Sequence, residues 1–170
     1  MKRLSLMLVA FTMCLMSSGL ALRASAQQSD EQAIRSVYDS FAAAFKLKDT
    51  AKLMSLYVPD ETLLVFDVVP PRQYAGAKAY KKDWEDFFAA FPGPVQFDIS
   101  DLAITSDHGL AYAHSIQHLV LADKDGKKSD LTVRVTDIFR KINGNWLIVH
   151  EHISVPVDLM SQKPDLSSKP

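Results

Sequence analysis

The chain has 170 residues, of which 48% are hydrophobic and 23% charged, and its formal net charge is −1. This charge gives no reason to expect nucleic acid or an anionic membrane as a partner. The only cysteine is Cys14, which lies in the first apolar stretch. Disulfides, thiolate nucleophiles and cysteine-bound zinc are therefore excluded for the rest of the chain.

Residues 1–26 have the pattern of a secretory signal peptide. Lys2 and Arg3 precede the apolar run LSLMLVAFTMCLM, and the small residues Ala24-Ser25-Ala26 follow it. The run is too short and wrongly flanked for a membrane span, so we expect cleavage after Ala26 and an exported protein, periplasmic or secreted. Loss of the three basic residues in this segment would change the net charge from −1 to −4. A remainder of about 140 residues is long enough for one domain with its own core.

Three helices are predicted in the first half of that remainder, over about 29–48, 49–58 and 77–91. Ser29 and Gln32 form a capping box before an apolar stripe at helical spacing. Pro59 ends the second, short helix. Aromatic residues recur at helical spacing in the third, which predicts that this face is buried.

Strands are predicted mainly in the second half, over about 95–104, 110–121, 131–142 and 145–155. One earlier strand, TLLVFD, covers 62–67 and is followed by a loop with two prolines. Helices followed by a run of antiparallel strands predict an α+β fold with the helices on one face of a curved sheet. The polar residues 159–170 are expected to form a flexible tail.

The last two strands meet at Asn143-Gly144, and the turn there decides which side chains face the core. A two-residue loop would place Asp137 opposite His150 and mismatch the apolar faces of the two strands. A three-residue loop with Gly144 in the left-handed conformation would pair Lys141 with Asn145 and bring both apolar faces together. We therefore expect the three-residue loop, with Asp137 and Glu151 facing inward.

The same alternation turns His150 and His152 toward the convex side of the sheet. Two histidines at this spacing can chelate a metal, but Arg134 and Arg140 lie on the same face and would repel it. We expect no metal site, and instead hydrogen bonds across the sheet or a homodimer interface that includes Arg134, His150 and His152. The inward acids are costly to bury as charges, which is typical of a functional cavity and also of a structural network.

The order of elements resembles the nuclear-transport-factor-2-like superfamily over residues 29–158. The segment RVTDIFRKINGNWLIVHEHISVPVD resembles the C-terminal hairpin of SnoaL-like proteins, and it is also similar to the association domain of calcium/calmodulin-dependent kinase. The resemblance implies a SnoaL-like domain over residues 27–158. Its expected fold is a cone in which a strongly curved, mainly antiparallel sheet wraps around the N-terminal helices and encloses a pocket. Members range from isomerases, dehydratases and cyclases to non-catalytic oligomerisation modules.

Ketosteroid isomerase offers the closest comparison for a reaction. In LLVFDVVPPRQYAG, Asp67 matches the position of its general base, and in DIFR, Asp137 matches its protonated acid, which donates a hydrogen bond to the oxyanion. The tyrosine of that family is replaced here by Phe41, with Tyr38 one turn earlier. The resemblance thus implies Asp67 and Asp137 as catalytic residues. The alternative for Asp67 is a strand-end residue that binds the loop backbone.

The function expected is proton transfer next to a carbonyl, by a cofactor-free isomerase or lyase that acts on a small apolar or carbonyl- or carboxylate-bearing molecule. The alternative is a non-catalytic ligand-binding or dimerisation module. For His114, a proton carrier and a structural hydrogen bond to a neighbouring strand both remain open. The residues expected to line the pocket are Tyr38, Phe41, Tyr57, Trp84, Tyr112, His114, Val149, Glu151 and Ile153.

Overall fold

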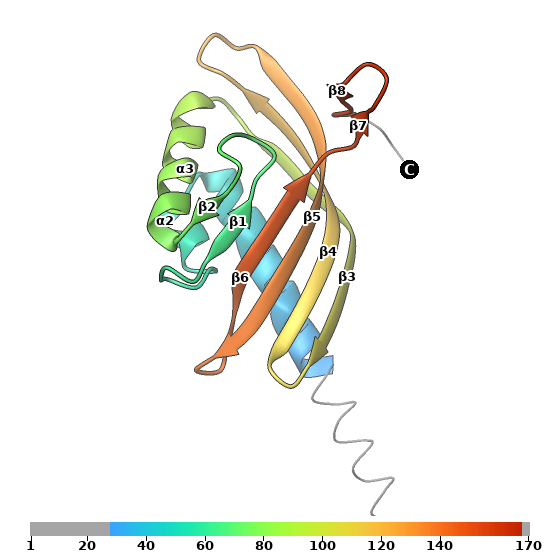
Figure 1. Cartoon of the computed structure of the whole chain (residues 1–170). Coiled ribbons are helices and arrows are strands. Elements are labelled where there is room, and N and C mark those ends of the chain that lie inside the picture. Colours follow the sequence, from blue (N-terminus) through green and yellow to red (C-terminus); the bar gives the residue numbers. More distant parts are fainter. Residues whose placement is uncertain (1–27, 168–170) are drawn as a thin grey trace, which may run out of the picture.

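The computed structural model describes residues 28–167 and contains helices packed against one curved sheet (Figure 1). Residues 28–47 are helical. The other elements are α2 (Thr50–Met54), β1 (Leu64–Phe66), β2 (Tyr74–Ala75), α3 (Ala77–Ala90), β3 (Gln96–Asp107), β4 (Leu110–Ala122), β5 (Lys128–Ile142), β6 (Asn145–Ser154), β7 (Val157–Asp158) and β8 (Lys163–Pro164). The predicted signal peptide lies outside the described residues. Within them, no helix is long and apolar enough to cross a membrane.

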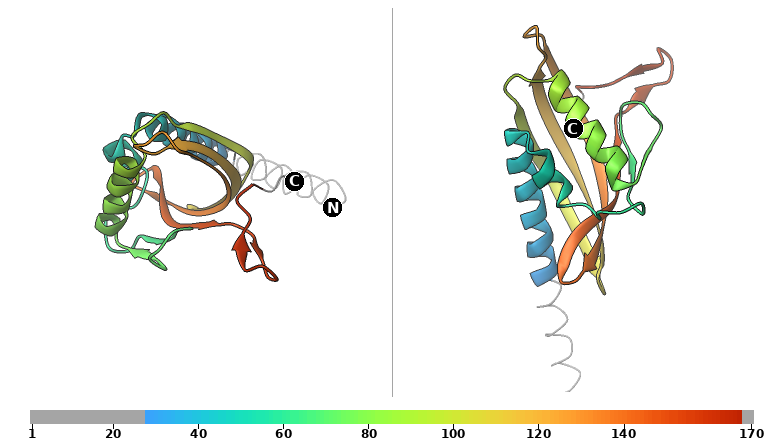
Figure 2. Two further views of the ribbon diagram at one scale, coloured as in Figure 1. Left: turned by 90° about the horizontal axis from the view of Figure 1, so that it is seen from above. Right: turned by 90° about the vertical axis from the view of Figure 1, so that its left-hand side faces the viewer.

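The main sheet has six strands in the order β2-β1-β6-β5-β4-β3. All neighbours pair antiparallel except β1 and β6, which are parallel. A register shift between Ser100 and Ala103 interrupts β3, with Asp101 in the left-handed conformation, and bulges of this kind bend a strand. Figure 2 shows the long strands curling around an interior that the helices close on one side. The predicted α+β cone is therefore confirmed.

Aromatic side chains from the helices fill one end of this cone. Phe45 of the first helix packs on Phe97 of β3, with ring centroids 4.5 Å apart, and edge-on against Trp84 of α3 at 5.7 Å. Phe45 and Phe97 are both 1% exposed. Burying an aromatic side chain of this size stabilises the fold by roughly 2–3 kcal/mol, so this cluster fixes the helices against the sheet.

The hairpin between β5 and β6 differs from the prediction. Ile142 pairs with Asn145, so the loop has two residues, and both Asn143 (φ 51°) and Gly144 (φ 84°) adopt positive φ. Such a turn matches the right-handed twist of the strands. The three-residue loop and the pairing of Lys141 with Asn145 were wrong. Lys141 instead pairs with Trp146.

The two-residue turn alone would place the apolar face of β5 and the apolar face of β6 on opposite sides of the sheet. A β-bulge brings them back to the same side. The register shifts by one residue between Ile138 and Phe139, which leaves Val149 without a partner in β5. On the turn side of this bulge, the even residues Trp146 and Ile148 are buried. Beyond it the odd residues face inward, and Glu151 lies opposite Asp137.

The chain beyond β6 continues as an ordered strap. β7 and β8 pair as a small hairpin, and the Thr132 backbone N–H donates to the Leu166 carbonyl at 2.7 Å. Half of this hairpin falls in the segment predicted as a flexible tail. β8 therefore lies beyond the expected domain boundary at Asp158.

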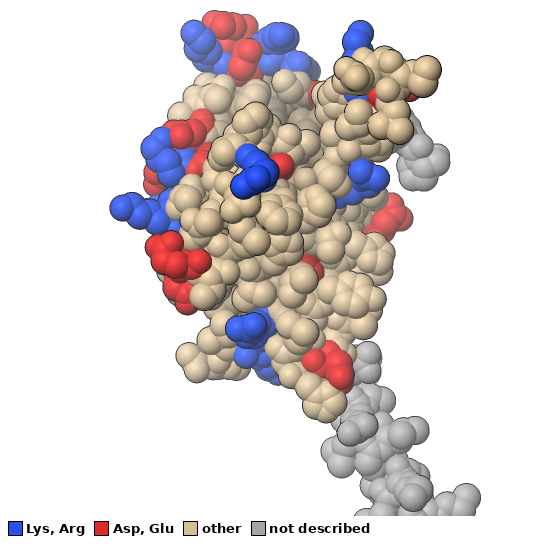
Figure 3. All heavy atoms as spheres, in the orientation of Figure 1, with Lys and Arg blue, Asp and Glu red and all other residues tan. Residues whose placement is uncertain are grey.

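Charged side chains are unevenly distributed over the surface. Figure 3 shows them gathered on α3 and at the tip of the β4–β5 hairpin, whereas the face over β1, β6 and β5 is mostly uncharged. On α3, Lys81 and Lys82 pair with Glu85 and Asp86 one turn later. The outer face of the sheet therefore carries fewer charged side chains than α3 and the hairpin tip in this view.

Candidate functional site

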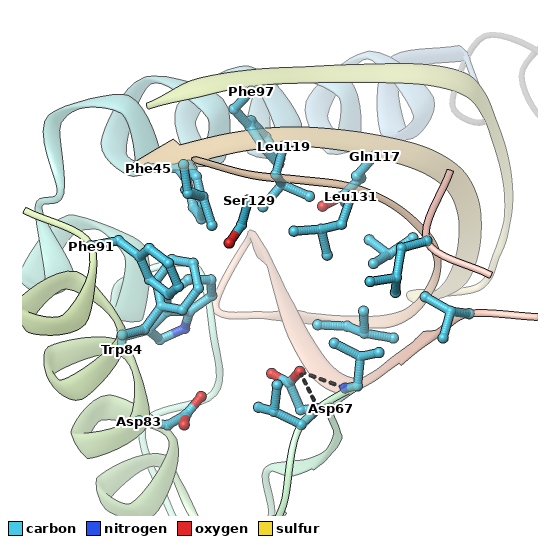
Figure 4. Close-up of a pocket in the computed structure, with 18 of the residues that line it drawn as sticks. Phe45, Asp67, Asp83, Trp84, Phe91, Phe97, Gln117, Leu119, Ser129 and Leu131 are labelled. Atoms are coloured by element: carbon cyan, nitrogen blue, oxygen red, sulfur yellow. Dashed lines mark hydrogen bonds between the residues drawn. The ribbon is translucent and has the colours of Figure 1, made fainter. Parts of the chain in front are cut away.

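A cavity of about 480 Å³ lies between the concave face of the sheet, α3, the loop after β1 and the C-terminal strap (Figure 4). This volume suits a small organic molecule. Most of its wall is apolar. The apolar lining residues are Phe41, Phe45, Val68, Val69, Trp84, Phe87, Phe91, Phe97, Leu119, Leu121, Leu131, Val133, Ile153, Val155, Pro164 and Leu166.

Asp67 is placed in the cavity wall by the end of β1. Its Oδ1 accepts hydrogen bonds from the backbone N–H groups of Val68 at 2.5 Å and Val69 at 3.4 Å. Burial and the nearby charge of Asp83 raise the pKa of Asp67 to about 6, against the lowering effect of these two N–H donors. The carboxylate thus both binds the loop backbone and faces a ligand-sized space.

Asp83 reaches the cavity from α3, on the same side as Asp67. The Tyr74 hydroxyl donates to its Oδ1 at 2.6 Å. Burial raises the pKa of Asp83, the Tyr74 hydrogen bond lowers it, and the charge of Asp86 raises it further. Figure 4 shows both aspartates below the Trp84 ring.

Two buried carboxyls face each other across β5 and β6. Asp137 and Glu151 are cross-strand partners, 1% and 3% exposed. Glu151 lines the cavity, whereas Asp137 lies behind it. Hydroxyl groups from the helical side bind the pair: Tyr38 donates to Asp137 Oδ2 at 2.5 Å, and Tyr80 donates to Glu151 Oε2 at 2.6 Å.

Tyr57, which follows α2, donates to Glu151 Oε1 at 3.1 Å. Its position is set by Ile148 of β6, whose backbone N–H donates to the Leu56 carbonyl at 2.9 Å and whose carbonyl accepts from Val58 at 2.9 Å. The β6 strand therefore anchors both the carboxylate and one of its donors.

The environment of this pair favours a shared proton. Burial raises the pKa of Asp137 to about 7, against hydrogen bonds with Tyr38 and Glu151. Burial and then the charge of Asp137 raise the pKa of Glu151 well above its ordinary value, against hydrogen bonds from Tyr80 and Tyr57. Asp137 Oδ1 has no hydrogen-bond partner among the described residues. Because two adjacent buried carboxyls do not ionise together, we expect one of the pair to keep its proton.

The structure brings some of the predicted site residues to the cavity and not others. Asp67, Phe41, Trp84, Glu151 and Ile153 line it. The other predicted residues on the inner side, Asp137, Tyr38 and Tyr57, lie behind the wall as part of the carboxyl–tyrosine network.

Three further residues expected in the pocket, beyond Tyr38 and Tyr57, do not line it. Tyr112 is 50% exposed and His114 is exposed, because the small odd residues Ala111 and Ala113 of β4 face inward instead. Val149 occupies the bulge in β6, which removes it from the inward-facing series. The sequence could not place β4 because both of its faces contain apolar residues.

Asp83, Tyr80 and Gln117 are site residues that the sequence analysis did not identify. Tyr80 and Asp83 lie one turn apart on α3, next to Trp84, and Gln117 is a polar residue on the inner face of β4. The only signal available was a polar residue within an apolar strand face or beside an aromatic stripe. Such a signal is too common to single out a site.

The histidines of β6 lie on the outer face of the sheet. His150 Nδ1 is 2.8 Å from the Leu64 carbonyl, to which it donates. The Phe66 ring contacts His150 and His152 edge-on, with centroids 5.1 and 5.7 Å apart. Within residues 28–167, no group of three or more His, Cys, Asp or Glu residues is arranged to hold a metal ion.

Comparisons with known proteins agree with this architecture. The profile of the SnoaL-like domain matches residues 34–158. A solved NTF2-like protein of unknown function from Pseudomonas putida KT2440 is 27% identical, with a TM-score of 0.76 over 84% of this chain and 98% of that one. No match to a curated protein was found.

Two further solved structures show the breadth of this fold. A proposed calcium/calmodulin dependent protein kinase II association domain from Xanthomonas campestris is 26% identical, with a TM-score of 0.62 over 71% of this chain and 84% of that one. A proposed scytalone dehydratase from Novosphingobium aromaticivorans is 18% identical, with a TM-score of 0.68 over 76% of this chain and 86% of that one. At this last level of identity the likeness concerns the fold alone.

The raised pKa of Asp137 makes stability depend on pH. This carboxyl has an ordinary pKa of 3.8 and a pKa of about 7 in the folded protein. The folded state binds more protons between these values, so the free energy of unfolding falls as the pH rises from about 4 to about 7. Asp137→Asn, which cannot ionise, should remove part of this decrease in urea denaturation at a series of pH values. An unchanged slope would contradict the assignment, and Asp39→Asn, an exposed site, serves as control.

The hydrogen bond from Tyr38 to Asp137 should contribute measurably to stability. Tyr38→Phe removes only the hydroxyl and leaves a buried carboxyl with one donor fewer, which should cost about 1.5–3 kcal/mol in the free energy of unfolding near neutral pH. Tyr112→Phe makes the same chemical change on the exposed outer face and should have an effect within about 0.5 kcal/mol. Equal effects of the two substitutions in denaturation experiments would contradict the role of this bond.

Proposed function

Because the chain belongs to the family of SnoaL-like domains, we propose that it binds a small, largely apolar molecule in its cavity and moves a proton on that molecule without a cofactor. The observation that carries the proposal is Asp67, a half-buried carboxylate with a pKa of about 6 in the wall of an apolar cavity. A base with a pKa near the working pH is ionised often enough to accept a proton and acidic enough to return it.

Glu151 is the best candidate for the second role, a hydrogen-bond donor to the oxygen of the ligand. The resemblance to ketosteroid isomerase assigned this role to Asp137, but Glu151 is the carboxyl that lines the cavity. Its raised pKa favours the protonated form, and an un-ionised carboxyl in an apolar site can stabilise a developing oxyanion. Asp137 then acts through Glu151, because its nearby charge raises the pKa of Glu151 and so favours the protonated donor.

The proposed reaction begins with a carbon next to a carbonyl. Asp67 takes a proton from this carbon, the electron pair of the C–H bond forms a C=C bond, and the carbonyl oxygen becomes an enolate oxygen that accepts a hydrogen bond from Glu151. In a ligand whose next carbons form a C=C bond, the product is a dienolate, and return of the proton from Asp67 to its far carbon moves the double bond and gives an isomer. In a ligand with a hydroxyl on the β-carbon, the enolate electrons instead form a C=C bond between the α- and β-carbons, and the hydroxyl leaves as water with the proton from Asp67.

Asp67→Asn tests the proposal most directly. Removal of a general base should slow proton transfer by about 100-fold or more, measured as hydrogen–deuterium exchange next to the carbonyl of small cyclic ketones by NMR in D₂O. The exposed Asp39→Asn variant should exchange at the wild-type rate. Equal rates in wild type and Asp67→Asn, with both proteins folded, would reject Asp67 as the base.

A non-catalytic binding module is the second candidate, and two observations favour it. Phe41 provides no hydroxyl where the related isomerases have a tyrosine, and Asp67 Oδ1 is already bound to two backbone N–H groups. Under this alternative Asp67 holds the loop after β1 in place. Ligands would then raise the melting temperature of the protein without any exchange or conversion.

The outer face of the sheet is our proposed homodimer interface. It carries Arg134, His150 and His152, together with the half-exposed Tyr112, in a region with few charged side chains (Figure 3). A like-charged carboxylate on both copies should disrupt such a symmetric contact. In sedimentation velocity experiments, His152→Glu should be monomeric at a concentration where the wild type is dimeric. Lys82→Glu, on α3, should not change the assembly, and a monomeric wild type would refute the interface.

A further inference from the structure

The charged groups of the cavity wall are all acidic. Asp67, Asp83, Asp130 and Glu151 line it, and none of the described lining residues is Lys, Arg or His. Two of these acids are set apart from the others: Asp130 is exposed, with His118 Nε2 2.8 Å from its Oδ1, and the raised pKa of Glu151 favours its protonated form. Asp67 and Asp83 therefore carry the negative charge that a ligand meets.

Each of these two aspartates has one uncommitted oxygen. Asp67 accepts its two backbone hydrogen bonds at Oδ1, and Asp83 accepts from Tyr74 at Oδ1. Within the described part of the chain, the Oδ2 atoms of both residues lack such a bond. The partners at Oδ1 are neutral N–H and O–H groups, so neither charge is neutralised by a cation. The two carboxylates also repel each other, since the charge of Asp83 raises the pKa of Asp67.

The wall beside these oxygens consists of aromatic rings. Figure 4 shows Trp84 and Phe91 on the side of the cavity above Asp83, with Asp67 facing them across the lower part of the opening. The faces of aromatic rings attract cations and repel anions. Trp84 is 7% exposed, and its indole N–H has no hydrogen-bond partner among the described residues. This N–H could bind only a hydrogen-bond acceptor, so the attraction of this wall for a cation comes from the ring faces.

We propose that the cavity selects an apolar molecule that carries a protonated amine, with the ammonium group bound at Asp83 Oδ2 beside the Trp84 ring. A carboxylate-bearing ligand, one of the classes that the sequence suggested, would be repelled by both aspartates. An ammonium there would neutralise the charge of Asp83. Because that charge raises the pKa of Asp67, its neutralisation would keep Asp67 ionised and available as a base. The inference rests on the proposed function only in that the cavity is the ligand site.

Binding of three matched probes tests the charge selection. Adamantylmethylamine, adamantylmethanol and adamantanecarboxylate share one apolar cage and differ in the charge of the polar end. In isothermal titration calorimetry at neutral pH and low ionic strength, the amine should bind about tenfold more tightly than the alcohol, as expected for one additional partly buried ion pair. The carboxylate should bind most weakly. Added salt should weaken the binding of the amine and leave that of the alcohol nearly constant.

Asp83→Asn should reduce the amine to the affinity of the alcohol, because the amide keeps the shape and loses the charge. Glu85→Gln removes a charge from the exposed side of the same helix and should preserve the wild-type order of the three probes. Equal affinities for amine and alcohol, tight binding of the carboxylate, or no binding of any probe would overturn the inference. The salt dependence in the wild-type protein decides the matter even if Asp83→Asn does not fold.

The outcome is separable from that of the proposed reaction. If the protein catalyses deuterium exchange on neutral ketones but does not prefer the amine, the proposed reaction is supported and the proposed ligand class is rejected. Preference for the amine without any exchange would retain the ligand class and favour the binding module.

Discussion

The burial of two carboxyls opposite each other in β5 and β6 constrains the rest of this structure. A pair of buried charges at this distance is unfavourable, and it becomes acceptable only when a proton is shared and the remaining lone pairs receive hydrogen bonds. The donors are Tyr38 of the first helix, Tyr57 shortly after α2, and Tyr80 of α3. The network therefore fixes the position of each helical segment relative to the concave face of the sheet.

The cavity follows from this arrangement. The curled sheet and the helices cannot fill the whole interior of the cone, and the aromatic cluster around Phe45 and Trp84 closes only one end of it. The remaining space is bounded by Glu151 from the network and by Asp67 at the end of β1. The same carboxyl that links the sheet to the helices thus reaches the cavity. Changes in its protonation should affect both stability and binding.

The family alone does not decide between catalysis and binding. Proteins with this fold include a proposed kinase association domain and a proposed dehydratase, so the function depends on the side chains of the site. In this chain those side chains are acids on an aromatic wall. This combination distinguishes it from a cavity suited to anionic ligands, whichever of the two functions it serves.

The sequence by itself determined much of the architecture. Helical and alternating apolar patterns located the helices and the long strands, and the resemblance of residues 134–158 to SnoaL-like hairpins identified the family. The inward orientation of Asp137 and Glu151 was also predicted, although for the wrong reason. The sequence analysis required a three-residue loop, whereas the protein uses a two-residue turn and a bulge at Val149. Both hairpin geometries bury Asp137 and Glu151 on the same face of the sheet. The alternation of apolar residues predicts only which face is buried, so it cannot distinguish the two geometries.

Only the tertiary structure decided which of these residues meet. In the structure Tyr112 and His114 lie on the outer surface. The sequence could not predict this, because β4 has apolar residues on both faces and its orientation depends on pairing with β5. It also placed Asp83 beside Asp67, residues from α3 and from the end of β1 whose proximity no local pattern encodes. Periodicity reports which side of an element is buried. The composition of a cavity depends on how the elements pack, and that is set by contacts between residues far apart in the sequence.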